Sequence, residues 1–546
     1  MQEKNDVKQV SLLRKPLINV SVILALSLLI NAMLSVHSWY PEARFWYTLI
    51  PVPESGGIFL FLLLFSYLPI ILRLVFITAL SSITVFLSVF STAEGFIVCT
   101  FRRRFVPWTD IAFIHPLTEM VFADSGFPVE NWILPIFLLL FFVLTLLVTA
   151  VLWILQRNMI KIPRTVMFPF IISLFIAGVF FAESPPLFFR VAQQRRPPEN
   201  IDALIESRSE YLESISRTKN DREDREFFFP NIEDKDIYLF IIESYGYTLF
   251  SNERHFSLME GFYSDLQENL SSRGYTIYSN FIDSTTFGGT SWLADATLLT
   301  GVRIQSQHAY DEIINTDVYN LTHLLDDAGY ERSMIAPGTR NADQNWRDFY
   351  QFDNYVFYRD FQYNGPIFTF GYMPDQFALN YVRNRFSLRD TSNPQFFEFI
   401  LVSSHAPFRF IPEYIEDWDS IDDGSMFYRT NNEEYDNNWL TGGEYPEGYT
   451  ASIRYVLHTV TEFLYRFANE EALVIIVGDH QPKYPVSEGG ASFSVPVHIL
   501  SRTRKDVFPF SFFGYTEGII PEQELPHTGM EEFLPQLLEV IGTEED

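Results

Sequence analysis

Five long apolar runs in the first third of the chain restrict its fold more than any other feature of the sequence. They cover residues 17–37, 57–73, 75–98, 132–155 and 165–183. A helix of roughly 17–25 apolar residues crosses a bilayer core. Basic residues precede the first run, as in a signal sequence, but the four later runs favour an uncleaved anchor. We predict five transmembrane helices.

Basic residues near these runs predict the orientation in the membrane. Lys and Arg accumulate on the cytoplasmic side, which places the N-terminus inside. Arg73 would lie in a tight turn between the second and third spans, and Arg157, Lys161 and Arg164 between the fourth and fifth, both inside. An odd number of spans places the C-terminal part outside. The arginines at 102–104 would then lie on the outer face, in either an interfacial helix or an ordinary solvated loop.

Charge divides the chain into two unlike parts. Residues 1–200 hold 15 Lys and Arg against 11 Asp and Glu, whereas residues 201–546 hold 24 against 57, and the net charge is -29. Because such an acidic domain would repel nucleic-acid phosphates, we expect no nucleic-acid partner. Cys99 is the only cysteine, which excludes an internal disulfide and a cysteine-based zinc site.

Residues 185–235 have the composition of a connector. They begin with two prolines, carry apolar residues at helical spacing between 200 and 216, and end in a charge-dense stretch. We therefore predict three parts: a five-helix transmembrane domain over 1–184, a linker with an amphipathic helix over 185–235, and an extracytoplasmic domain over 236–546.

From residue 236 onward, short apolar runs alternate with helical patterns. The alternation predicts an α/β domain with a mostly parallel central sheet. Predicted strands cover 237–242, 332–336, 396–402, 472–477 and 495–500, and predicted helices cover 321–328, 450–467 and the closing segment 530–542.

Polar residues follow several predicted strands at the point where each ends, which is where ligands gather in such sheets. Glu243 follows the first strand, and Asp479 and His480 follow the strand at 472–477. Buried carboxylates are unfavourable unless a cation neutralises them, and oxygen ligands with one imidazole suit Mn²⁺ or Zn²⁺ better than Mg²⁺. The hydroxyl of Thr290 could share this ion, lose its proton and attack phosphorus or sulfur.

The segments 237–246, 288–291 and 477–480 resemble, in order and spacing, the sulfatase branch of the alkaline phosphatase superfamily. The chain is most similar to lipoteichoic acid synthase and related phosphoglycerol transferases, over about the last 310 residues and in its five-span preface. This resemblance implies a sulfatase-like catalytic domain over 236–546 with one Mn²⁺ held by Glu243, Thr290, Asp479 and His480, and Thr290 as the nucleophile. Ser291 is the competing hydroxyl.

The resemblance also implies three residues near the substrate phosphate. His405, in the segment 403–408, corresponds to a substrate-binding histidine. Trp346 and Arg347 correspond to a tryptophan and an arginine that the family separates by one residue, whereas here they are adjacent. Arg340 is therefore a competing phosphate ligand, and core packing is the alternative role for Trp346.

These correspondences imply a transferase of the bacterial cell membrane. It would move phosphoglycerol from phosphatidylglycerol to a glycan or glycolipid hydroxyl through a phosphothreonine. The Cys/Ser-x-Pro-x-Arg signature of true sulfatases is absent around Thr290, which disfavours sulfate ester hydrolysis. A phosphoethanolamine transferase, a phosphodiesterase and a non-catalytic membrane scaffold remain as alternatives.

Overall fold

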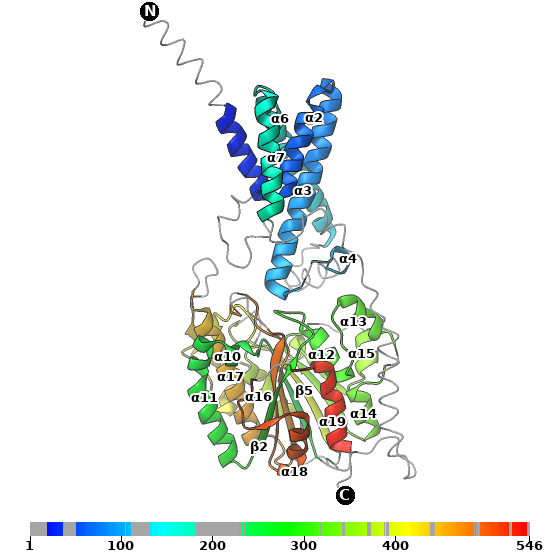
Figure 1. Cartoon of the computed structure of the whole chain (residues 1–546). Helices are drawn as coiled ribbons and strands as arrows, with labels where there is room; N and C mark the ends of the chain where they lie inside the picture. Colours follow the sequence, from blue (N-terminus) through cyan, green and yellow to red (C-terminus); the bar gives the residue numbers. More distant parts are fainter. Residues whose placement is uncertain are drawn as a thin grey trace, which may run out of the picture. The chain divides into compact units, whose positions relative to one another are not determined.

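The chain divides into two compact units, Met1–Pro198 and Glu199–Asp546, and Figure 1 shows helices in the first and an α/β fold in the second. The boundary falls within the predicted connector, most of which lies outside the described residues. The computed structural model describes residues 19–35, 51–103, 105–110, 130–181, 229, 232, 235–316, 318–340, 344–368, 373–386, 388, 393–436, 443–484, 486–487, 492–523 and 527–542.

The first unit is built from apolar helices. Within its described residues, two helices contain stretches long and apolar enough to cross a membrane, 70–98 in α3 (Ile70–Phe101) and 134–159 in α6 (Glu130–Met159). The other three predicted spans correspond to shorter apolar helices: Asn19–Leu34, α2 (Pro53–Leu64) with the turn after it, and α7 (Arg164–Phe181). The five-span arrangement therefore remains a prediction. α2 packs on α7 and α3 on α6.

The predicted position of Arg73 within the turn is wrong. The chain turns earlier, through a short 3-10 segment (Phe65–Tyr67), and α3 begins after Pro69, so Arg73 lies in the first turn of a helix. Proline disfavours helical geometry in the residue before it, and Leu68 is accordingly extended. Arg157 and Arg164 do flank the turn between α6 and α7. The interfacial helix was expected within residues 100–130, of which 104 and 111–129 lie outside the described residues; the described part holds the end of α3 and the short helix α4 (Pro107–Asp110).

The second unit contains the predicted α/β sheet, and most of its strand pairs are parallel. The order is β10-β2-β9-β8-β1-β5-β3-β4, with β11 beside β2; β9 runs antiparallel to β8 and β2, as does β10 to β2. The strands are β1 (Ile237–Ile242), β2 (Thr276–Asp283), β3 (Glu331–Ala336), β4 (Asn354–Phe357), β5 (Gln395–Leu401), β8 (Leu473–Gly478), β9 (Ser494–Ser501), β10 (Thr516–Glu517) and β11 (Thr528–Gly529).

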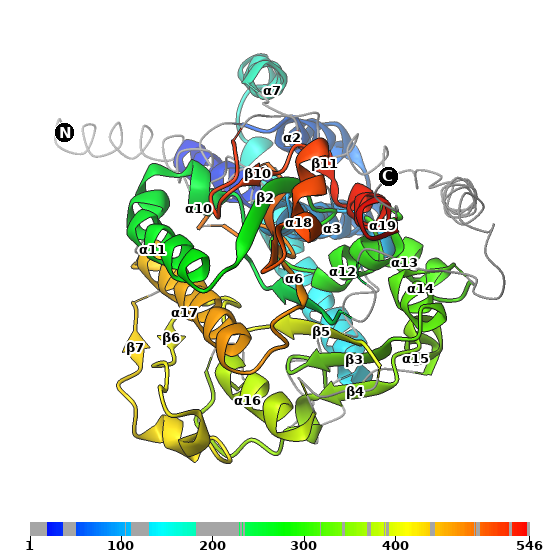
Figure 2. The same cartoon turned by 90° about the horizontal axis from the view of Figure 1, so that it is seen from below.

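Helices cover both faces of this sheet, as Figure 2 shows. One face packs against α11 (Glu253–Ser272), α16 (Asp375–Arg385) and α17 (Tyr445–Arg466). The other packs against α12 (Ser291–Thr300), α14 (Leu321–Asp327), α15 (Gln344–Tyr350) and α19 (Phe533–Gly542). The predicted helices at 321–328, 450–467 and 530–542 are confirmed within a few residues. A small hairpin pairs β6 (Phe410–Ile411) with β7 (Glu433–Glu434).

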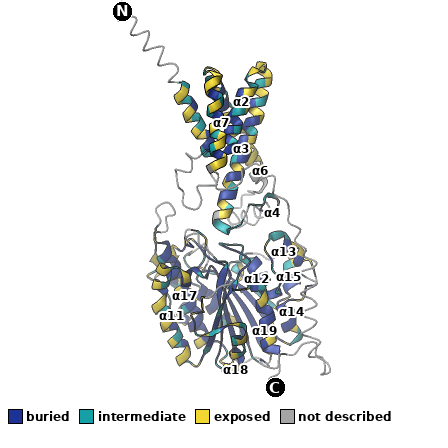
Figure 3. Ribbon diagram, in the orientation of Figure 1, coloured by how far each residue is buried: buried dark blue, intermediate teal, exposed yellow. Residues whose placement is uncertain are grey.

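The centre of the sheet explains why it forms from this sequence. β1 and β8 read Ile-Tyr-Leu-Phe-Ile-Ile and Leu-Val-Ile-Ile-Val-Gly and are buried at every position, as parallel strands covered on both faces require. Figure 3 shows the same burial along the sheet. β1 pairs with β5 on one side and with β8 on the other. Strands that come later in the chain therefore lie on both sides of β1.

Candidate metal and phosphoryl-transfer site

The carboxyl end of β1 lies where the strand order reverses, which is the usual ligand position in open α/β sheets. Backbone bonds of the sheet fix the first two site residues there. The Glu243 amide donates to the Leu401 carbonyl at 3.2 Å, and the Asp479 amide donates to the Ile242 carbonyl at 3.3 Å. A Cβ on Gly478 would lie 1.9 Å from the Tyr245 carbonyl oxygen. Glycine is therefore required immediately before Asp479.

Glu243, Asp479 and His480 form a compact group of possible metal ligands. One ligand atom from each lies within 4.8 Å of the others, and their side chains are at most 10% exposed. His480 Nε2 is 3.4 Å from Glu243 Oε1 and 3.5 Å from Asp479 Oδ2. His480 Nδ1 is 2.8 Å from the Gln481 carbonyl. If Nδ1 donates there, Nε2 presents its lone pair to the group, as in a metal ligand.

Electrostatics at this group also fit a bound cation. Burial raises the pKa of Asp479 well above its usual range, and the Glu243 carboxylate raises it further. Burial opposes ionisation of Glu243 too, but the nearby imidazoles of His480 and His405, together with hydrogen bonds from Asp479 and Ser244, outweigh it and lower the Glu243 pKa. Two adjacent carboxylates cannot both ionise in a buried site without a compensating positive charge. A divalent ion would supply that charge.

Thr290 and Ser291 begin α12 beside this group, but their hydroxyls point differently. Thr290 is left-handed, with φ 63°, which is a strained conformation for a β-branched residue. Its Oγ1 donates to the Gly289 carbonyl at 2.6 Å. Ser291 Oγ donates to Glu243 Oε2 at 3.1 Å and lies 3.4 Å from His480 Nε2. Ser291 therefore faces the group directly, and the choice of Thr290 as nucleophile stays a prediction.

The loop after β5 brings His405 to the same edge. Ser404 Oγ donates to the backbone carbonyl of Glu243 at 2.6 Å, which joins the His405 loop to the end of β1. His405 is half-buried and close enough to act on the pKa of Glu243. Its role in substrate binding remains a prediction.

Trp346 and Arg347 lie on α15, and both are half-buried against aromatic side chains. The Trp346 ring centroid is 5.0 Å from that of Tyr350 and 5.7 Å from that of Tyr355, and the Arg347 guanidinium lies 4.6 Å from the Tyr355 ring. These contacts agree with the packing alternative for Trp346. The competing Arg340 lies 5.3 Å from the Tyr358 ring.

Two buried acids were missed from the sequence, and the first of them is close enough to interact with Asp479 and Glu243. Asp295 lies on α12, one turn after Ser291, and Glu398 lies in the middle of β5. Neither Asp295 Oδ1 nor either Glu398 oxygen has a hydrogen-bond partner in the described part of the chain. Burial raises the pKa of each well above its usual range, and the carboxylates of Asp479 and Glu243 add to the effect at Asp295. The only sign of these residues in the sequence is that each is an isolated acid within an apolar segment.

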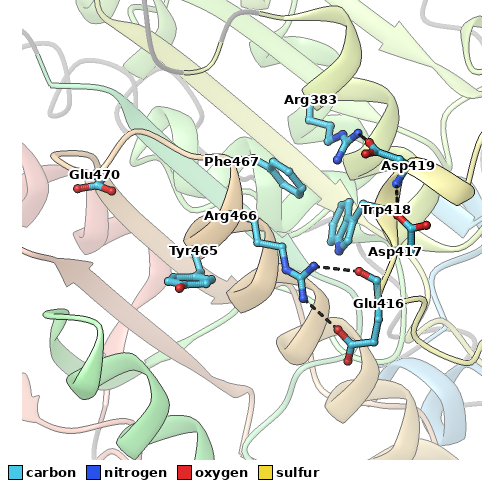
Figure 4. Close-up of a pocket in the computed structure, with 9 residues that line it drawn as sticks. All are labelled: Arg383, Glu416, Asp417, Trp418, Asp419, Tyr465, Arg466, Phe467 and Glu470. Atoms are coloured by element: carbon cyan, nitrogen blue, oxygen red, sulfur yellow. Dashed lines mark hydrogen bonds and ion pairs between the residues drawn. The ribbon is translucent and has the colours of Figure 1, made fainter.

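A cavity of about 470 Å³ lies elsewhere on the domain, lined by Arg383, Trp418, Arg466, Glu470 and their neighbours. Arg466 ends α17 and Glu470 precedes β8, so the cavity lies toward the amino end of β8, away from Asp479. Its two arginines form ion pairs with acidic residues of the lining, Arg466 with Glu416 at 3.0 Å and Arg383 with Asp419 (Figure 4). The cavity does not contribute to the metal group.

Sequence comparison places this geometry in a family. A family model described as Sulfatase matches residues 256–539, more than half of the chain. The chain belongs to the sulfatase family. The resemblance to the sulfatase branch is thereby confirmed. Divalent metal binding and a phosphoryl or sulfuryl transferase or hydrolase chemistry agree with this family and with the ligand group.

Several solved structures match part of the chain at low identity and low TM-score. An alkaline phosphatase superfamily protein from Vibrio parahaemolyticus is 17% identical, with a TM-score of 0.36 over 61% of this chain and 75% of its own. The lipoteichoic acid synthase LtaP from Listeria monocytogenes is 16% identical, with a TM-score of 0.35 over 58% and 74%. The Streptococcus pyogenes phosphoglycerol transferase GacH, in complex with sn-glycerol-1-phosphate, is 16% identical, with a TM-score of 0.35 over 63% and 83%. Among curated proteins, none matches the sequence.

Proposed function

We propose that this sulfatase-family protein is a membrane-bound, metal-dependent phosphoglycerol transferase. The observation that carries the proposal is the buried group of Glu243, Asp479 and His480, which lies beside the hydroxyls at the start of α12. These residues and Thr290 would hold one divalent ion, with Mn²⁺ the first candidate and Zn²⁺ or Mg²⁺ the alternatives. When bound, the ion would favour loss of the hydroxyl proton and stabilise charge on the phosphoryl oxygens.

The proposed reaction has two steps. The Thr290 oxygen attacks the phosphorus of phosphatidylglycerol, and the bond from phosphorus to the diacylglycerol oxygen breaks, which leaves phosphoglycerol on Thr290. His405 gives a proton to the departing oxygen. A hydroxyl of a glycan or glycolipid acceptor then attacks the same phosphorus, its proton passes to His405, and the bond from phosphorus to the Thr290 oxygen breaks, which restores both Thr290 and His405. Trp346 and Arg347 are the proposed contacts for the donor headgroup.

The apolar helices of the first unit give the membrane part of the proposal. Two of the described helices have the length and composition of spans, and we propose five spans in the bacterial cell membrane, with the N-terminus in the cytoplasm and the catalytic domain outside. This arrangement would hold the site near the headgroups of its lipid donor. The single cysteine disfavours the disulfide-rich phosphoethanolamine transferases as an alternative.

A lipid comparison tests the proposal. The full-length protein in detergent is given Mn²⁺ and fluorescent phosphatidylglycerol or phosphatidylethanolamine, and released diacylglycerol is measured beside Thr290→Ala. Release from phosphatidylglycerol alone, abolished by the substitution, supports the proposal. Release from phosphatidylethanolamine instead would assign the rival transferase. Phosphoglycerol that goes to water even with an acceptor present would indicate a phosphodiesterase, and no release from either lipid would favour a scaffold.

A further inference from the structure

A buried carboxylate from another element holds the loop that carries His405. Asp375 lies in the first turn of α16 and is fully buried. Its Oδ1 accepts the Val402 amide at 2.9 Å, and its Oδ2 accepts the Ser403 amide at 3.0 Å. The Asp375 amide donates in return to Ser403 Oγ at 2.8 Å. Three hydrogen bonds thus join one residue of α16 to the two residues that follow β5.

On its other side, the loop is held by the backbone of Glu243, one of the proposed metal ligands. Ser404 Oγ donates to the Glu243 carbonyl at 2.6 Å, and the His405 amide donates to the Val402 carbonyl at 3.0 Å. The backbone before His405 is therefore held between α16 and the end of β1. A displacement of Val402 or Ser403 would move His405 relative to Glu243.

The chemistry of Asp375 indicates that these bonds are needed. Burial of a carboxylate is unfavourable unless hydrogen bonds replace its water. Burial raises the pKa of Asp375 to about 6, although the amides of Val402 and Ser403 oppose the shift. Asparagine has the same shape but only one acceptor oxygen, and its NH₂ group would face one of the two amides. Only a carboxylate therefore accepts both bonds in this geometry.

We propose that Asp375 is a positioning residue that fixes the His405 loop for binding of the donor phosphate. The inference rests on the proposed function, because that function places His405 beside the phosphate. Asp375 would act mainly through the loop, since its side-chain bonds go to Val402 and Ser403, although Glu243 is close enough to raise its pKa.

Asp375→Asn in the full-length protein tests this inference. Loss of one charge-assisted bond should raise KM for phosphatidylglycerol about tenfold, with kcat and Mn²⁺ affinity changed less. Hydrogen exchange measured by mass spectrometry should speed up in the peptide that contains Val402 and Ser403. Ser403→Ala removes only the acceptor of the Asp375 amide, so it carries the test if the asparagine variant does not fold.

Asp236→Asn is the matched control, because the Asp236 carboxylate also accepts two hydrogen bonds in a buried position, at the opposite end of β5. It is buried, and its carboxylate accepts the Gln395 amide at 2.8 Å and the Asn469 side-chain amide at 3.1 Å. We expect a similar loss of stability in this variant with KM unchanged. An equal rise of KM in both variants would overturn the inference, because it would show a general effect on the strand.

A double-substitution cycle separates positioning from folding. If Asp375 acts through His405, then Asp375→Asn should add little to the KM of His405→Ala, whereas independent effects would multiply and would overturn the inference. Hydrogen exchange does not depend on the reaction. If the wild type does not turn over phosphatidylglycerol, the proposed function fails, while unchanged exchange at Val402 and Ser403 would refute the anchoring itself.

Discussion

The adjacent hydroxyls of Thr290 and Ser291 should respond differently when each is removed. Thr290→Ala deletes the proposed nucleophile, whereas Ser291→Ala deletes a hydroxyl that donates to Glu243 Oε2 at 3.1 Å. The first change should abolish the covalent intermediate and also remove one of the four expected metal ligands. The second should weaken metal binding and leave a nucleophile in place.

The geometry sets the size of each effect. A hydrogen bond to a charged group contributes about 1.5–3 kcal/mol, and about 1.4 kcal/mol is a factor of ten in affinity. Ser291→Ala should therefore weaken Mn²⁺ binding by about 10–100-fold. Loss of an attacking hydroxyl removes the covalent route altogether, so Thr290→Ala should lower turnover by at least about a thousandfold.

Mass spectrometry identifies which hydroxyl carries the phosphoglycerol group, and calorimetry measures the Mn²⁺ affinity of each variant. The full-length protein is mixed briefly with phosphatidylglycerol, quenched in acid and digested, and the phosphoglycerol group is located in the peptide that spans both residues. We expect it on Thr290 in the wild type and in Ser291→Ala at saturating Mn²⁺. A group found on Ser291, or a Thr290→Ala variant that still forms the adduct, would refute the assignment of the nucleophile.

Three further predictions follow from buried positions. Glu398→Met should raise the free energy of unfolding by about 1–3 kcal/mol, because it removes an acid that has no hydrogen-bond partner among the described residues; a lower thermal midpoint by tryptophan fluorescence would contradict this. His255 is fully buried and burial lowers its pKa from 6.5 to about 4, so the stability it contributes is present above pH 6.5 and is lost toward pH 4. His255→Phe should remove about 3 kcal/mol of that pH dependence in urea unfolding at pH 7 and 4, and an unchanged pH profile would refute it. Gly478→Ala should displace Asp479, because its Cβ would lie 1.9 Å from the Tyr245 carbonyl oxygen; Mn²⁺ affinity equal to that of the wild type in calorimetry would contradict the required close approach.

The central strands were predictable because burial on both faces leaves a clear mark in the sequence. β1 and β8 are unbroken apolar runs, and both agree with the predicted strands within a residue. β2 was missed because it carries polar residues that find partners only in the fold. Ser279, for example, is buried, and its hydroxyl lies 2.7 Å from His498 Nδ1. No local pattern reveals such a partner.

The grouping of Glu243, Asp479 and His480 was predictable for a similar reason. Acids and a histidine directly after buried strands meet at one edge of a parallel sheet. The direction of the two hydroxyls was not predictable, because it depends on the left-handed backbone of Thr290. The role of Asp375 also escaped the sequence, because its partners lie 27 and 28 residues away along the chain. Long-range contacts of this kind appear only when α16 and β5 are packed together.

A titration of Mn²⁺ into the metal-free full-length protein tests the central claim most directly. Isothermal calorimetry compares the wild type with Asp479→Asn, which keeps the shape of the ligand but not its charge. We expect one ion per chain in the wild type and an affinity at least about tenfold weaker in the variant. No saturable binding to the wild type, or equal affinity in both proteins, would contradict a metal centre at Glu243, Asp479 and His480.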